Sequence, residues 1–208
     1  MAPTGPLRFS QTGVMQLRRG GRSLRFTAEQ EMAVDQVGFL WNARFRLAPL
    51  VTLRVHDWYR DGEGGLDGRL FARIPLFRAG GSDVSRGEAM RYLAELAWAP
   101  QAMLANSALA WREIDGTTIG VATKVAGEYV AVKIHFDSAG DITAASAAAR
   151  PRAVGKTSVP TPWRGTYGDY GLVDGVRLPT AAEVAWLLPD GPFTYFRARI
   201  SGAAANVP

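Results

Sequence analysis

The chain has 208 residues, of which 47% are hydrophobic and 21% are charged, and its formal net charge is +5. These proportions are those of an ordinary globular domain and exclude a disordered or membrane-embedded chain. With no cysteine and only two histidines, the sequence excludes disulfides, thiolate metal sites, iron–sulfur clusters and multi-histidine metal centres. We therefore expect a single domain, residues 1–208, without a metal or cofactor.

Positive charge gathers in the first part of the chain. Residues 1–60 hold nine arginines and four acidic residues, whereas the rest holds 15 basic and 15 acidic residues. Such a cluster attracts phosphates, but a solvated hairpin rim in a protein from a GC-rich genome explains it equally well. No apolar run is long enough for a signal peptide or a membrane span. We therefore expect a cytoplasmic protein.

The first half of the chain alternates between apolar and polar residues, which predicts strands. Between Phe39 and Leu47 every second residue is apolar, and Arg44 and Arg46 lie among the residues between. This alternation is typical of a sheet with one dry and one wet face. The strands predicted in this half are 7–18, 23–34, 39–47, 51–60 and 66–74, with a glycine-rich turn at 61–65.

A helical period replaces the alternation after Ser85. Ser85 and Glu88 have the spacing of a capping box, in which each side chain satisfies a free backbone amide. Glu88, Arg91 and Glu95 fall on the polar side, where we expect an exposed Arg91–Glu95 pair. The helix should end before Pro100. Its apolar stripe consists of Met90, Leu93, Ala94, Ala97 and Trp98.

Alternation then resumes and continues to the C-terminus. The predicted strands are 109–114, 117–125, 128–136, 142–150, 165–173, 181–188 and 193–200, with a proline-rich connector at 159–163. About eleven or twelve strands in a meander form a sheet that tends to curl, and one helix can cover its concave face. The predicted fold class is mainly β: a strongly curved antiparallel half-barrel packed on one α-helix.

The most distinctive residues lie in the C-terminal third. They are Pro162-Trp163-x-Gly165-x-Tyr167-x-Asp169-Tyr170, Asp174-Gly175-Val176-Arg177-Leu178-Pro179, Glu183-Val184-x-Trp186 and Gly191-Pro192-Phe193-x-Tyr195. With these spacings the chain resembles an uncharacterised bacterial family, common in actinobacteria, that is catalogued as a domain of unknown function. Members often have additional N-terminal sequence, sometimes with a membrane segment. More remotely, the strand order and single helix resemble the half-barrel of periplasmic LolA-like lipoprotein carriers, which implies an apolar pocket between sheet and helix.

Enzyme chemistry finds little support in the residues. There is no Gly-x-Ser-x-Gly motif, and the glycine run 62–68 lacks the spacing of a dinucleotide site. An enzyme would draw its acid–base residues from His56, His135, Asp169 and Glu183. However, His56 is adjacent to Asp57 in a strand, so the two side chains point to opposite faces.

The six tryptophans are a better indication of function. Either they fill the core, or some of them line a pocket, since ligand sites are mostly apolar with a few polar groups. The leading hypothesis is non-enzymatic binding of an apolar or amphipathic small molecule or lipid. An enzyme and a basic surface that docks an anionic membrane or, less favoured, nucleic acid are the alternatives. The candidate pocket residues are Trp41, Phe45, Leu93, Trp98, Trp111, Tyr170 and Trp186.

Overall fold

The structure is a computed structural model that describes residues 5–205. Thirteen strands in this range form one antiparallel sheet. The strands are β1 (Leu7–Gln16), β2 (Ser23–Met32), β3 (Phe39–Ala48), β4 (Val51–Arg60), β5 (Glu63–Leu70), β6 (Ile74–Gly80), β7 (Ala110–Asp115), β8 (Thr118–Val125), β9 (Glu128–Phe136), β10 (Ile142–Val154), β11 (Thr157–Val173), β12 (Val176–Leu188) and β13 (Gly191–Ala205). The helices are α1 (Ser82–Ala94), the 3-10 helix η1 (Glu95–Trp98) and α2 (Pro100–Ala105).

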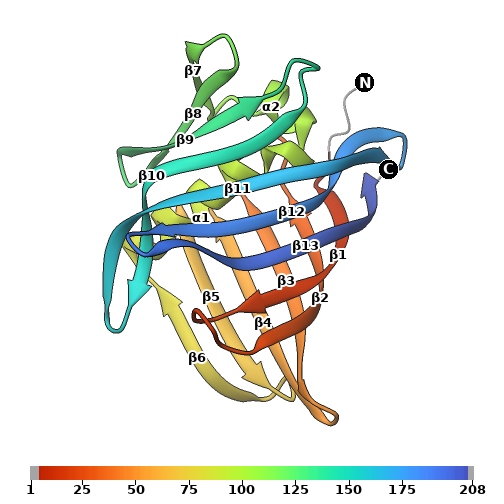
Figure 1. Cartoon of the computed structure of the whole chain (residues 1–208), viewed down its shortest axis with the longest axis vertical. Helices are drawn as coiled ribbons and strands as arrows, with labels where there is room; N and C mark the ends of the chain where they lie inside the picture. The colour runs from red at the N-terminus through yellow and green to blue at the C-terminus, as the bar shows by residue number, and fades with distance from the viewer. Residues whose placement is uncertain (1–4, 206–208) are drawn as a thin grey trace.

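The order of the strands explains where the helices lie. From the centre of the sheet, β1 to β6 run outward to one edge, and β7 to β13 return from the opposite edge until β13 pairs with β1. The chain must therefore cross from one edge to the other between β6 and β7. Residues 82–105 make this crossing on the concave side, where α1 packs against β5, β8, β9 and β10 (Figure 1).

The strands form because alternate side chains enter a common core on the concave side. In β3, Phe39, Trp41 and Phe45 are buried whereas Arg44 and Arg46 are exposed, as the alternation predicts. The curved antiparallel half-barrel with a packed helix is thus confirmed, with thirteen strands rather than eleven or twelve.

Two local predictions about strands were wrong. The connector expected at 159–163 is part of β11. In this strand Pro160 lies opposite Pro151 of β10, so neither residue of that pair can donate a backbone hydrogen bond. The glycine-rich turn expected at 61–65 is shorter, because Glu63 already begins β5. The edge strand β6 was missed because its apolar residues are consecutive and exposed, so they show no alternation.

The predicted capping box was also wrong. The helix begins three residues before Ser85, after Gly81, whose φ of 98° is accessible to glycine at little cost. The Ser85 hydroxyl instead accepts a hydrogen bond of 2.9 Å from the backbone N–H of Gly64 in β5. This contact ties the first turn of α1 to the sheet and leaves the Glu88 side chain free to point into the interior.

Candidate functional site

A cavity of about 200 Å³ lies between the helical crossing and the concave face of the sheet. Three of its lining residues are the aliphatic Met15, Ala182 and Val184. Its aromatic residues are Trp41, Trp98, Trp163, Tyr167, Tyr195 and Phe196, and its charged residues are Asp57, Glu88, Arg91, Glu95 and Arg150. A cavity lining that combines aromatic rings with five charged groups is unusual in a protein interior, because an unpaired buried charge is strongly destabilising.

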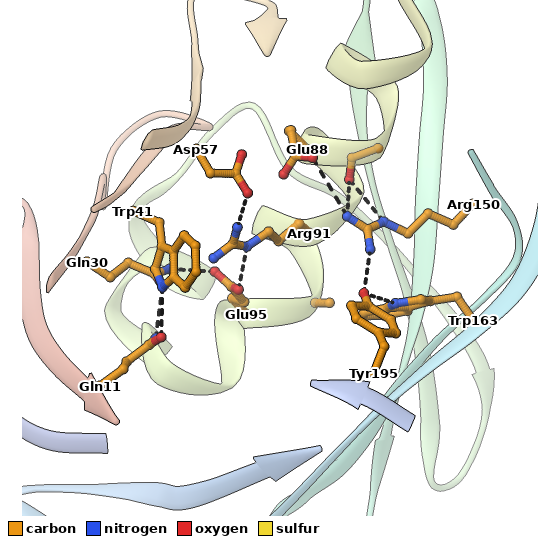
Figure 2. Close-up of polar contacts among 12 residues, drawn as sticks. Gln11, Gln30, Trp41, Asp57, Glu88, Arg91, Glu95, Arg150, Trp163 and Tyr195 are labelled. Carbon is orange, nitrogen blue, oxygen red and sulfur yellow. Dashed lines mark hydrogen bonds and ion pairs between the residues drawn. The ribbon is translucent and has the colours of Figure 1, made fainter. Parts of the chain in front are cut away.

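The first part of this charge cluster is a stripe on the helix. Glu88, Arg91 and Glu95 are spaced by three and four residues, so they lie on one face of the helical segment. The Arg91 guanidinium donates to Glu95 Oε1 through Nε, at 2.7 Å, and to Asp57 of β4 (Figure 2). Arg91 also lies over the ring of Phe39, with its Cζ 4.6 Å from the ring centroid.

The expected exposure of the Arg91–Glu95 pair was wrong. The two side chains are 14% and 12% exposed. The reason is that α1 is buried on more than its apolar side, with Glu88 as well as Ala89, Tyr92 and Leu93 buried. A helix of this kind is enclosed by its neighbours, and its charged stripe is enclosed with it.

A chain of hydrogen bonds continues from Glu95 into β1, β2 and β3. Gln30 donates to Glu95 Oε2 at 2.5 Å, Gln11 donates to Gln30 Oε1 at 2.9 Å, and the Trp41 indole donates to Gln11 Oε1 at 2.9 Å (Figure 2). Gln11 and Gln30 are each 1% exposed. Both oxygens of Glu95 therefore accept hydrogen bonds.

The second arginine enters the cavity from the opposite wall because of two β-bulges. A register shift between Ala147 and Arg150 turns Arg150 of β10 inward, and one between Val184 and Ala185 adds Tyr195 of β13 to the inner face. Arg150 donates to the backbone oxygen of Gly87 at 3.1 and 3.2 Å and to the Tyr195 hydroxyl at 3.3 Å.

Tyr195 is also the acceptor for the indole N–H of Trp163, at 3.0 Å. The guanidinium of Arg150 lies over the Trp163 ring, with its Cζ 5.1 Å from the ring centroid. Arg150 Nη2 is 4.0 Å from Glu88 Oε1, so it attracts that carboxyl group without a close hydrogen bond.

Asp57 and Glu88 are the incompletely satisfied members of the cluster. Among the described residues, Asp57 Oδ1 and Glu88 Oε2 are buried and accept no hydrogen bond. Burial, followed by the nearby Asp57, raises the pKa of Glu88 to about 8. Burial also raises the pKa of Asp57, against the lowering effects of Arg91 and of a hydrogen bond with Glu88. With a pKa of about 8, Glu88 is protonated at neutral pH.

A model of one protein family matches residues 3–198, and its description is a family of unknown function, DUF6544. The chain belongs to the DUF6544 family. This confirms the family resemblance that the C-terminal residues indicated. No curated protein matches the chain.

Several solved structures are similar to this DUF6544 chain. The chain resembles a DUF1329 family protein from Desulfovibrio piger, with a TM-score of 0.51 and 12% identity over 99% of this chain and 87% of that chain. It also resembles a LolA superfamily protein from Nitrosomonas europaea, with a TM-score of 0.49 and 10% identity over 99% and 89%. A putative outer membrane lipoprotein-sorting protein domain from Vibrio parahaemolyticus has a TM-score of 0.49 and 10% identity over 98% and 86%. The likeness concerns the fold.

The structure brings two of the seven candidate pocket residues to the cavity, Trp41 and Trp98. Phe45 and Leu93 are buried in the surrounding core, and Trp186 stacks on Tyr195 from outside the cavity lining. Trp111 is 40% exposed on the edge strand β7.

Tyr170 points away from the cavity, because its hydroxyl donates to the backbone oxygen of Ile142 at 2.8 Å. The charged residues of the lining, and the glutamines behind them, were missed by sequence reasoning.

The four candidate acid–base residues do not converge. His135 hydrogen-bonds Ser146 at 2.8 Å, Asp169 pairs with Arg199, and Glu183 pairs with Arg197. His56 lies opposite Asn42 in β3, on the outer face of the sheet. None of the four lines the cavity. Within residues 5–205, no group of histidine, aspartate or glutamate side chains is arranged to hold a metal ion, and no helix is long and apolar enough to cross a membrane.

The outer face of the sheet carries a broad groove of about 1150 Å³. Its rim includes Pro49 and Leu50, and Leu50 is 86% exposed. Its charged residues are Arg25, Arg44, Arg46, Arg197, Arg199 and Glu183. We call this region the outer groove. Five arginines and one glutamate give it a positive field that attracts anions.

Proposed function

We propose that this protein binds an amphipathic small molecule in the cavity between α1 and the sheet, without chemical reaction. The observation that carries this proposal is the composition of the cavity wall, which joins six aromatic side chains to a buried charge cluster. Ligand sites have this character: a mostly apolar surface for affinity and a few placed polar groups for orientation.

The size of the cavity limits its ligand. Ligand pockets usually measure about 300–1,000 Å³, whereas this cavity has about 200 Å³. With roughly 30 Å³ per non-hydrogen atom, taken from liquid water, it holds about seven such atoms. That is enough for a polar head and a short chain. Three lining residues, Met15, Val184 and Phe196, are only partly buried, so a longer chain would leave the cavity past them.

A matched pair of substitutions tests the proposal. Ala182 is 4% exposed and lines the cavity as well as bordering the outer groove, whereas its neighbour Ala181 borders the outer groove alone. We expect an apolar naphthalene dye and six-carbon amphiphiles to bind the native protein saturably and to raise its melting temperature. Ala182→Leu fills part of the cavity and should weaken binding about tenfold or more, while Ala181→Leu should leave it unchanged.

The readout is the fluorescence of the dye and of the tryptophans, with the melting temperature of each variant as the control for folding. Overpacking alone costs roughly 1–3 kcal/mol, so Ala182→Leu should remain folded. A folded wild-type protein that binds neither the dye nor any amphiphile would overturn the proposal.

The outer groove favours a second candidate function, and here we propose docking to anionic lipid headgroups. Arg25, Arg44 and Arg46 form no ion pair among the residues that the structure describes, so their charges are available to phosphates. The exposed Leu50 on the rim offers an apolar contact that a membrane surface accepts and a nucleic-acid backbone does not. This combination favours a lipid surface over nucleic acid.

Vesicle sedimentation tests this second candidate. We expect binding to phosphatidylglycerol vesicles at low salt, loss of binding at high salt, and none to phosphatidylcholine. Replacing Arg25, Arg44 and Arg46 by glutamine should abolish binding, whereas the same change at Arg73, Arg78 and Arg112, which lie outside the outer groove, should not. If both triple variants lose vesicle binding equally, the effect comes from net charge and not from the outer groove. Tighter binding to DNA than to vesicles would exclude a lipid role.

A further inference from the structure

The chemistry of the cavity's unsatisfied atoms specifies the head of its ligand. Asp57 Oδ1 and Glu88 Oε2 are both buried and both belong to residues that line the cavity, and once Glu88 is ionised both are hydrogen-bond acceptors without a donor. Glu88 as a whole is 9% exposed. A ligand that fills these vacant positions must therefore donate hydrogen bonds.

The charge balance points in the same direction. The lining contains three carboxyl groups, of Asp57, Glu88 and Glu95, and two guanidinium groups, so it carries a net charge of −1 when all are ionised. The guanidiniums are already engaged: Arg91 donates to Glu95 and Asp57, and Arg150 donates to Gly87 and Tyr195. With the proton on Glu88 the lining is neutral, so an anionic head would add uncompensated negative charge, whereas a cationic head that displaces this proton leaves the lining neutral.

We propose that the cavity selects amphipathic molecules whose head is a primary ammonium group that donates hydrogen bonds to Asp57 Oδ1 and Glu88 Oε2. This inference rests on the proposed binding function and adds the class of ligand. The ammonium takes the place of the proton that Glu88 otherwise holds. Its short apolar chain then lies among the rings of Trp98, Tyr167 and Phe196, whose faces also attract a cation.

Binding of such a ligand is coupled to release of a proton. The groups that face Glu88 are Asp57 from β4, Arg91 and Glu95 from the helical crossing, and Arg150 from β10. Because burial and Asp57 raise the pKa of Glu88 to about 8, its proton must leave before the ammonium can bind at neutral pH. By linkage, affinity for the ammonium should rise about tenfold for each pH unit up to about pH 8 and then level off.

Isothermal titration with three matched six-carbon probes tests the inference. The probes are hexylamine, 1-hexanol and hexanoate, which share a chain and differ in the head. We expect hexylamine to bind at least tenfold more tightly than the other two at about pH 8. About half a proton should be released per molecule bound at that pH, and about one at about pH 6–7, where Glu88 is protonated before binding. Its advantage over 1-hexanol should shrink as the pH falls toward about 6.

Glu88→Gln separates this inference from a general preference for cations. Glutamine keeps the size of Glu88 but cannot ionise, so hexylamine should lose about tenfold or more in affinity and its pH dependence, while 1-hexanol binding stays unchanged. Glu183→Gln, in the outer groove, is the control that should leave all three affinities as they are. If Glu88→Gln does not fold, the pH dependence of hexylamine affinity in the wild-type protein is sufficient to test the inference.

The possible failures are distinguishable. If 1-hexanol or hexanoate binds as tightly as hexylamine, the ammonium inference is wrong and the cavity still binds ligands. If hexylamine affinity is independent of pH in the wild type, or keeps its pH dependence in Glu88→Gln, the exchange with the Glu88 proton is wrong. If no probe binds the folded protein, the proposed function fails and this inference fails with it.

Discussion

The helical crossing on the inner side of the sheet and the outer face of the sheet each hold an arginine–glutamate pair, and the two pairs have almost the same length. On the inner side, Arg91 Nε lies 2.7 Å from Glu95 Oε1, with the side chains 14% and 12% exposed. On the outer side, Arg197 Nε lies 2.8 Å from Glu183 Oε1, with the side chains 53% and 52% exposed. The two distances alone would predict interactions of similar strength. The different exposure of the two pairs predicts different strengths.

What differs is the cost of separating the partners. Water screens the outer pair and solvates either member alone, so such pairs contribute little. The inner pair lies in a low-dielectric interior, where a charge left without its partner is strongly destabilising. The inner charges therefore hold one another in place around the cavity, and the outer charges remain available to a partner from solution.

Removing one arginine from each pair tests this comparison with the largest expected effect. Arg91→Ala leaves Asp57 and Glu95 buried without their cation and should lower the free energy of unfolding by about 3–5 kcal/mol. Arg197→Ala should lower it by less than about 1 kcal/mol. Urea denaturation of both variants provides the measurement. Equal losses would mean that water reaches the inner cluster and screens it as it does the outer one.

The sequence contained part of the signal for this cluster. Asp57 alternates with Leu53, Val55 and Tyr59, all of which are buried, so the period of β4 places it on the inner face. Asp57 was considered only as a partner of His56, and its side chain was not assigned to the core. The burial of the helical stripe could not be anticipated in this way, because an amphipathic pattern predicts that the polar side with Arg91 faces the solvent.

Other parts of the cluster lie beyond a pattern argument. Arg150 and Tyr195 reach the cavity because β-bulges interrupt the alternation in β10 and β13, and the residues give no period from which a bulge can be placed. The overall fold is more robust: twelve of the thirteen strands between residues 5 and 205 were predicted, and a bulge shifts the faces of a strand without removing it. Fold class was therefore predictable, while the composition of the cavity depended on interruptions of the pattern.

The pH dependence of stability gives a smaller and sharper test of the same comparison. The pKa of Glu88 is about 8 in the folded protein, against an ordinary value of 4.5. Between these values the folded state keeps a proton that the unfolded state releases, so the free energy of unfolding is greatest at low pH. It should fall by about 1.4 kcal/mol for each pH unit as the pH rises through this window.

Urea denaturation at several pH values from about 5 to 8 measures this slope, and two substitutions isolate its source. Glu88→Gln should remove most of it, because glutamine stays neutral, and Asp57, whose pKa burial also raises, accounts for the remainder. Glu183→Gln on the outer face should retain the slope. His135, whose pKa burial lowers, contributes in the opposite direction, but equally in both variants, so the difference between them belongs to Glu88. An unchanged slope in Glu88→Gln would mean that Glu88 is ionised in the folded protein and that inner and outer carboxylates behave alike.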